Sequence, residues 1–163
     1  MGFFTRRVRR TRSGDFEIRL PEQERELLAN LVPQLRTALT DGAGDGATGV
    51  ADPGLRRLFP SAYVDDPEHD AEYRSLVHDD LLGRRLAALD TVEETLAATR
   101  LDEEQLLTWM GAVNDLRLVL GTRLDVSEDT DLSPDPDDPE GPALAVYAYL
   151  GILLESIVAA LAD

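Results

Sequence analysis

The sequence has 163 residues, a formal net charge of −16 and 43% hydrophobic residues, which is the size of a single domain with one core. It contains no cysteine and no lysine, so all sixteen of its basic residues are arginines. Thiol chemistry, disulfides, thiolate metal sites and Schiff bases are therefore excluded within these residues. The acidic balance argues against broad nucleic-acid binding, because phosphate is held by basic side chains.

Residues 3–20 show the pattern of a β-hairpin. Phe16, Ile18 and Leu20 alternate with charged residues, as in a half-buried strand, and RSGD at 12–15 is a turn signal. The first strand carries five arginines in seven residues, and two interpretations of this arm stay open. It binds DNA phosphate or an acidic protein patch, or its arginines pair across the hairpin with Glu17 and Asp15. The five arginines are Arg6, Arg7, Arg9, Arg10 and Arg12.

Four helical segments follow the hairpin. Stripes of leucine and other apolar residues predict helices at 22–40, 68–98, 102–124 and 143–161, and acidic first turns support the first and third of these. Pro33 should kink the first helix without abolishing it. The glycine-rich segment 41–54 and the segment 125–142, rich in proline and aspartate, should be flexible loops. The sequence therefore predicts one mainly α domain over 1–163, a bundle of about four main helices preceded by a short N-terminal β-hairpin.

The last helical segment is nearly apolar and approaches the length that crosses a membrane. No arginine flanks it, and its large side chains cluster on one side, which favours a bundle-core helix in a cytoplasmic protein with no membrane contact. Its other side carries Ala148, Ile152 and Ala159, and these residues permit the close approach of a second copy. We therefore keep a homodimer among the expected partners.

The segment WMGAVNDLRLVLGTRLDV at 109–126 places polar residues in an apolar helix. On a helical wheel, Arg117 falls within the face that contains Trp109, Asn114 lies at its edge, Asp115 on the opposite side and Arg123 at the other margin. A buried arginine needs a carboxylate, and we expect Glu93 first and Glu155 second. Two alternatives are that the arginine and asparagine border a groove for a partner or ligand, and that Arg117 reaches out to water.

The remaining motifs give no catalytic, cofactor or metal site. The segment 129–140 has acids at EF-hand spacing, but Pro134 stands where that loop needs a glycine with positive φ. His69 and His78 are nine residues apart on a helix and point to opposite faces, which excludes a shared metal. We therefore predict a protein that is not an enzyme and binds no cofactor.

Residues 106–126, together with LRRLFPSAYVDDPEHDAEYR at 55–74, resemble an actinobacterial domain-of-unknown-function family. Some of its members are regulators of the oxidative-stress response of the AosR type. The residues that carry the resemblance are Trp109, Asn114, Asp115, Arg117, Leu118, Gly121, Arg123 and Leu124. The resemblance implies a cytoplasmic, non-enzymatic transcriptional regulator whose partner is an RNA polymerase sigma factor or the polymerase. The alternatives are an adaptor or scaffold protein with no nucleic-acid contact, and a hydrolase with paired carboxylates.

Overall fold

The computed structural model describes residues 6–44, 51–59, 67–133 and 135–163, with the side chains of 67–71 and 74 excepted. The chain forms the elements β1 (Val8–Arg10), β2 (Phe16–Ile18), α1 (Glu22–Gly42), the 3-10 helix η1 (Pro53–Leu55), α2 (Pro67–Thr95), β3 (Arg100–Leu101), α3 (Glu103–Arg123) and α4 (Gly141–Ala162). This confirms the predicted fold class, a helical protein with a β-hairpin in front. Of the predicted loop at 41–54, residues 45–50 lie outside the described part.

The hairpin is part of a three-stranded sheet, and the sequence did not predict the third strand. β1 and β2 pair antiparallel with Val8 opposite Ile18, and β3 adds antiparallel to β2 with Leu101 opposite Phe16. The helical pattern at 68–98 extended too far, because α2 ends at Thr95. The carbonyl of Thr99 instead accepts a hydrogen bond of 2.9 Å from the backbone N–H of Ile18. A two-residue strand is too short to show an alternating pattern.

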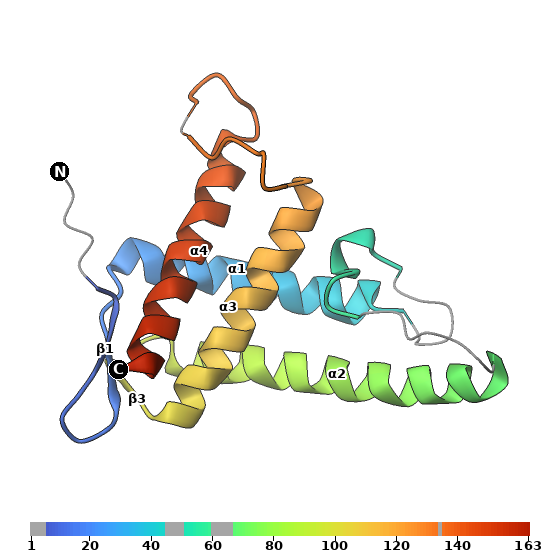
Figure 1. The fold of residues 1–163 in the computed structure, drawn as a ribbon, viewed down its shortest axis with the longest axis horizontal. Helices are drawn as coiled ribbons and strands as arrows, with labels where there is room; N and C mark the ends of the chain where they lie inside the picture. The colour runs from blue at the N-terminus through green and yellow to red at the C-terminus, as the bar shows by residue number, and fades with distance from the viewer. Residues whose placement is uncertain (1–5, 45–50, 60–66, 134) are drawn as a thin grey trace.

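The helices form two crossing pairs. Figure 1 shows α1 and α2 running along the length of the molecule, while α3 and α4 lie side by side across them. The core lies where these pairs meet the sheet, and α3 is central to it because it packs against α4, α2 and η1. The largest fully buried side chains are Trp109, Phe16, Ile18, Leu28, Leu39, Leu55, Leu58, Leu89, Leu101, Leu106, Leu150 and Leu153.

Local signals explain where α3 begins and how closely it meets α4. Asp102 and Gln105 form a capping box, in which each side chain accepts a hydrogen bond from the other's backbone N–H, at 2.7 and 2.9 Å. This satisfies donors that every helix N-terminus leaves open.

Near the C-terminal end of α3, a Cβ at Gly121 would lie 2.9 Å from the ring of Tyr147. Glycine at this position therefore lets the Tyr147 ring on α4 pack directly on the backbone of α3.

Candidate interaction site

The polar residues of the 109–126 motif are distributed along α3 and contact different neighbours. Trp109 is fully buried, and its Nε1–H donates a hydrogen bond of 2.7 Å to Thr95 Oγ1 at the end of α2. Arg123 is exposed and lies at the C-terminal end of α3, where its Nη2 is 2.9 Å from Asp52 Oδ2. Asn114 is half-buried. The motif thus ties α3 to several neighbouring segments of the fold.

Asp115 is buried, although the wheel placed it on the side away from the core. It is 6% exposed, and its Oδ1 accepts a hydrogen bond of 2.6 Å from Arg85 Nη1 on α2. Arg85 Nη2 also donates to the carbonyl of Leu58, at 2.9 Å. Burial raises the pKa of the Asp115 carboxyl, and the Arg85 guanidinium opposes part of that rise. The ion pair therefore holds α2, α3 and the segment after η1 together.

Arg117 does not make the ion pair that the sequence predicted. Glu93, the first expected partner, lies 2.6 Å from Arg36 on α1, and Glu155 is exposed on α4. The Arg117 guanidinium instead lies over the ring of Tyr147, 5.3 Å from its centroid. The wheel assumed one buried face, whereas α3 is covered by α4 on one side and by α2 on another. Arg117 therefore contacts the Tyr147 ring on α4, and Asp115 contacts the Arg85 guanidinium on α2.

Three of the five N-terminal arginines contact the folded protein itself. Arg6 is 2.6 Å from the carboxylate of Asp163, and Arg10 lies over the Phe16 ring at 4.7 Å. Arg7 donates to both carboxylate oxygens of Glu24, with its closest contact at 2.7 Å. Glu17, which one of the two interpretations pairs with the arm, lies opposite Arg9 in the strand register and accepts a hydrogen bond of 2.8 Å from Arg19. Arg9 and Arg12 are exposed.

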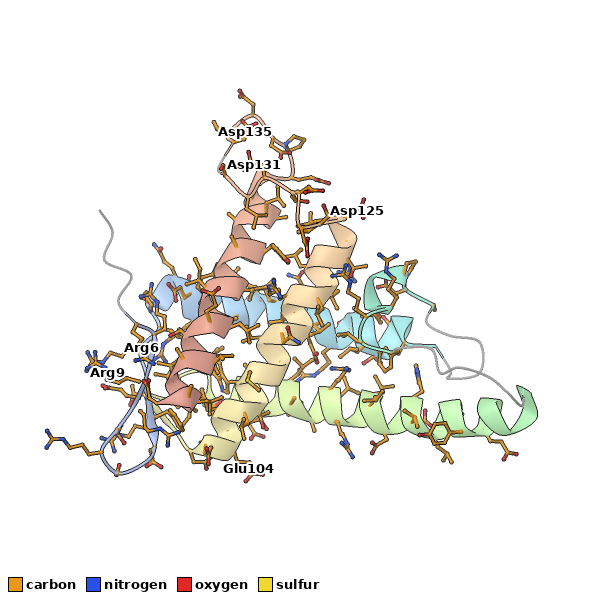
Figure 2. All side chains as sticks on the ribbon, in the orientation of Figure 1. Arg6, Arg9, Glu104, Asp125, Asp131 and Asp135 are labelled. Atoms are coloured by element: carbon orange, nitrogen blue, oxygen red, sulfur yellow. The ribbon has the colours of Figure 1, made fainter. Side chains whose placement is uncertain are left out.

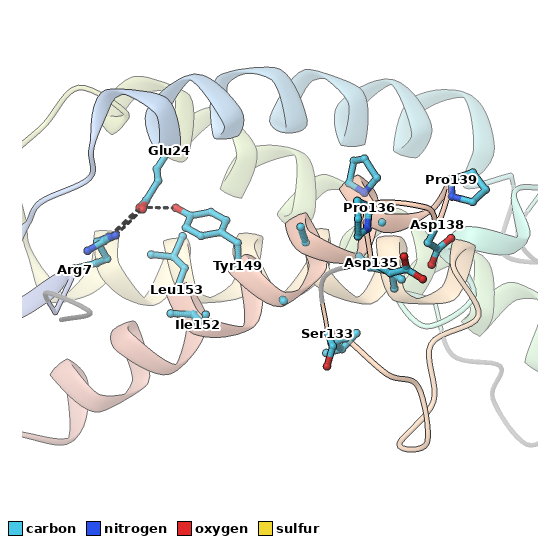
Figure 3. A pocket seen from close by; sticks show the side chains of 16 residues that line it. Arg7, Glu24, Ser133, Asp135, Pro136, Asp138, Pro139, Tyr149, Ile152 and Leu153 are labelled. Carbon is cyan, nitrogen blue, oxygen red and sulfur yellow. Dashed lines mark hydrogen bonds and ion pairs between the residues drawn. The ribbon is translucent and has the colours of Figure 1, made fainter. Parts of the chain in front are cut away.

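A cavity of about 690 Å³ lies between α4 and the acidic loop that precedes it. This volume is within the range of small-molecule and peptide-anchor pockets. Its apolar lining comes from α4 and from Leu132, Pro136 and Pro139 of the loop, as Figure 3 shows for the labelled residues. Ile152 and Leu132, two of the exposed large apolar side chains at 42% and 39%, both line it. We call this cavity the α4 groove.

The polar end of the α4 groove is a network of Arg7, Glu24 and Tyr149. Tyr149 donates its hydroxyl to Glu24 Oε2 at 3.0 Å, beside the forked contact of Arg7 (Figure 3). Burial raises the pKa of Tyr149, and the Glu24 carboxylate adds to the rise. This network was not predictable from the sequence, because its members lie before β1, in α1 and in α4, up to 142 residues apart (from 7 to 149). Glu24 gave only the signal of an acid in a first helical turn.

Two aspartates of the acidic loop, Asp135 and Asp138, line the α4 groove. Residues 125–140 hold eight aspartates and glutamates and no arginine. The Oδ1 atoms of Asp131, Asp135 and Asp138 each accept a backbone hydrogen bond from two residues further on, at 2.8 to 2.9 Å. No cluster of three or more metal-ligating side chains occurs within the described ranges. Figure 2 shows Asp131 and Asp135 in the loop at the end of α4 that lies away from Arg6 and Arg9, and Asp125 at the neighbouring end of α3.

The histidines do not provide a metal site in the described residues. His78 is buried, and its Nε2 lies 3.1 Å from the carbonyl oxygen of Gly44. Its ring packs against Phe59, with centroids 4.5 Å apart. The side chain of His69 lies outside the described part of the chain. His78 therefore links α2 to the end of α1.

α4 is the one described helix that is long and apolar enough to cross a membrane by length and composition. In the fold it packs against α3 and β1, and Leu150, Leu153, Ile157 and Ala160 are its buried residues. Ile152 and Val158 are 42% and 48% exposed. The apolar character of α4 thus serves the core on one side and leaves apolar surface on the other.

Comparison with known proteins confirms the family that the sequence resembles. Residues 5–161 match the family model described as "Domain of unknown function (DUF2017)". Proteins named oxidative stress regulator AosR from Mycobacterium tuberculosis and Mycobacterium bovis are 30% identical to this chain, over 96% of it and 88% of their own length. A putative oxidative stress regulator AosR from Mycobacterium leprae is 32% identical, over 68% of this chain and 58% of its own length. No solved structure matches. The match along nearly the whole chain shows that this protein belongs to the DUF2017 family.

Proposed function

We propose that this chain is a non-enzymatic regulator of an oxidative-stress response and that it acts by binding another protein. The observation that carries this proposal is the relation to proteins named oxidative stress regulators over 96% of the chain. The implied partner is an RNA polymerase sigma factor or the polymerase. A thiol–disulfide switch within these 163 residues is excluded, because the sequence has no cysteine. The stress signal therefore reaches this chain through a partner or through other chemistry.

The contacts of the N-terminal arm favour protein binding over DNA binding. Arg6 and Arg7 are already paired with carboxylates of the same chain, and Arg10 donates to the carbonyl of Leu161 at 3.3 Å. Counter-ion release by phosphate binding needs several available cations. Only Arg9 and Arg12 of the five are exposed without such a contact. This observation favours the second candidate function, an adaptor with no nucleic-acid contact, as the way in which the regulator works.

The test is a deletion of the gene in the source bacterium, followed by transcript profiling after a hydrogen peroxide challenge. We expect the induction of stress genes to change and to return when the intact gene is restored. Identical profiles in the deleted and parent strains would overturn the proposal. In parallel, the purified protein is titrated with duplex DNA at low salt. Binding that disappears in the Arg9→Ala/Arg12→Ala variant would show direct DNA contact and would exclude the adaptor alternative.

A further inference from the structure

We propose that the α4 groove is the docking site for a segment of a partner protein that carries apolar side chains flanked by arginine or lysine. This inference rests on the proposed function, because it names the surface and the chemistry of the partner of the regulator. The first reason is the composition of the wall. Ala148, Ile152 and Leu153 of α4 line a cavity of about 690 Å³ together with Leu132, Pro136 and Pro139 of the loop. Such a cavity accommodates an apolar anchor of a partner peptide.

The second reason is that exposed apolar surface coincides with the cavity. Ile152 is 42% exposed and Leu132 is 39% exposed, and they come from α4 and from the loop, the two segments that supply most of the lining. Apolar side chains that line a recess and remain open to water mark a surface where a partner removes them from solvent. Glu155 follows Ile152 by less than one turn of α4 and is also exposed. A charge at this position suits a partner in water better than the interior of a lipid bilayer.

The third reason is charge, and it selects the class of partner. Within the described residues, none of the eight acids at 125–140 forms an ion pair with an arginine. Asp135 and Asp138 line the groove itself. Arg7 and Glu24 at the inner end of the groove neutralise each other, so the field at the entrance is negative. A basic segment is attracted to such an entrance.

A second copy of this chain fits the groove less well than a basic partner. Each copy brings a net charge of −16, and its own acidic loop would approach the loop of the first. The arginines that a second copy could offer from its hairpin are Arg9 and Arg12, since Arg6, Arg7 and Arg10 make contacts within their own chain. The charge balance therefore favours a different protein with a basic segment.

The test places a photo-crosslinking amino acid at position 152 of the full chain in the source bacterium and identifies the crosslinked peptide by mass spectrometry. The matched control is position 158, because Val158 is on the same helix, is similarly exposed at 48% and does not line the groove. We expect an adduct at 152, and not at 158, with a peptide that contains apolar residues and at least two arginines or lysines. An adduct with a second copy, with a lipid or with an acidic peptide would overturn the proposal, as would equal adducts at both positions or none at 152.

The crosslinked segment is then synthesised, and its binding to the purified protein is measured by fluorescence anisotropy. We expect Ile152→Glu to weaken binding at least ~tenfold, because it places a charge in the apolar lining that contacts the anchor of the partner. Val158→Glu should have little effect. Asp135→Asn with Asp138→Asn should also weaken binding and flatten its salt dependence. Asparagine keeps an oxygen that can accept the backbone hydrogen bonds of these positions. The charge control is Glu103→Gln with Glu104→Gln, at the N-terminal end of α3.

Restoring the deleted strain with the Ile152→Glu gene separates this inference from the proposed function. We expect that the Ile152→Glu gene does not restore the peroxide response and that the Val158→Glu gene does. If the Ile152→Glu gene restores the peroxide response fully, the groove is not the docking site, while the regulatory function stands. If the deletion itself has no effect on the response, the proposed function fails first. Circular dichroism of the purified Ile152→Glu protein must match that of the unaltered chain, so that loss of binding is not loss of folding.

Discussion

Replacing Arg85 with methionine should destabilise this protein strongly at neutral pH, because it leaves the buried carboxylate of Asp115 without its counter-ion. The two groups are 2.6 Å apart, and their side chains are 23% and 8% exposed. Removing one partner of a buried ion pair costs roughly 3–5 kcal/mol. Water reaches part of Arg85, so we expect the lower end of this range. A loss of about 3 kcal/mol corresponds to a decrease in the melting temperature of about 6–12 °C for a domain of this size.

The loss in the Arg85→Met variant should also depend on pH. Burial raises the pKa of Asp115 above its ordinary value. At pH values between the unfolded-state and the folded-state pKa of Asp115, the folded protein binds more protons than the unfolded chain. The free energy of unfolding therefore decreases as the pH rises through this window. Arg85 opposes the rise, and its removal extends the window upward. Acidification from about pH 7 to about pH 5 should therefore restore more stability to the variant than to the unaltered protein.

Urea denaturation followed by the fluorescence of Trp109 measures both effects, because this is the single tryptophan of the sequence and it is fully buried. Asp115→Asn is the control, and it should cost less than Arg85→Met. The arginine that remains can reach water and keeps its hydrogen bond to the Leu58 carbonyl. The double variant should be more stable than Arg85→Met alone. A loss within about 0.5 kcal/mol at neutral pH, or one that acid does not reduce, would refute the reasoning.

Three further substitutions test contacts elsewhere in the fold. Tyr149→Phe should cost about 1 kcal/mol of unfolding free energy in urea denaturation. In an alkaline absorbance titration Tyr149 should ionise at higher pH than an ordinary tyrosine, because burial and the Glu24 carboxylate raise its pKa. Ionisation of Tyr149 together with the other tyrosines would contradict the contact. Since that folded-state pKa is raised, stability should also fall as the pH rises above the ordinary value of 10.0. Asp102→Ala removes the capping box of α3 and should cost about 1 kcal/mol, whereas Asp102→Asn should retain most of it. Arg123→Ala breaks the exposed contact with Asp52 and should cost less than about 1 kcal/mol; a cost that high salt does not reduce would show that the contact is not electrostatic.

The elements of this fold were predictable where they are long or strictly alternating. The four helices follow from their apolar stripes, with acidic first turns as a further signal in α1 and α3. The hairpin follows from the alternation of Phe16 and Ile18 with charged residues. β3 was not predictable, because two residues give no period and its position depends on pairing with β2. Tertiary hydrogen bonding decided where α2 ends.

The polar residues of α3 show why a helical wheel was not enough. The wheel gave Arg117 a buried ion pair and placed Asp115 on the side opposite the core face. In the structure Asp115 is the buried, paired charge, and Arg117 is half-buried over the Tyr147 ring. A wheel ranks one face of an isolated helix, but α3 has neighbours on more than one side. The partner of Asp115 lies 30 residues earlier, on a helix whose own arginine gave no distinguishing signal. Which charge is buried depends on the neighbour that faces it.

The two charged segments of this chain looked alike as sequence patterns, since each is a run of one sign that suits a solvated surface or a docking surface. Their contacts separate them. The arginine run is largely used within the fold, because Arg6, Arg7 and Arg10 contact Asp163, Glu24 and Leu161. The acidic run at 125–140 makes no ion pair with the described residues, and it borders the apolar α4 groove. A charge run is informative about partners only after the pairs that it makes within its own chain are set aside. In this protein that leaves the acidic run, which is why we propose it as the surface for a basic partner.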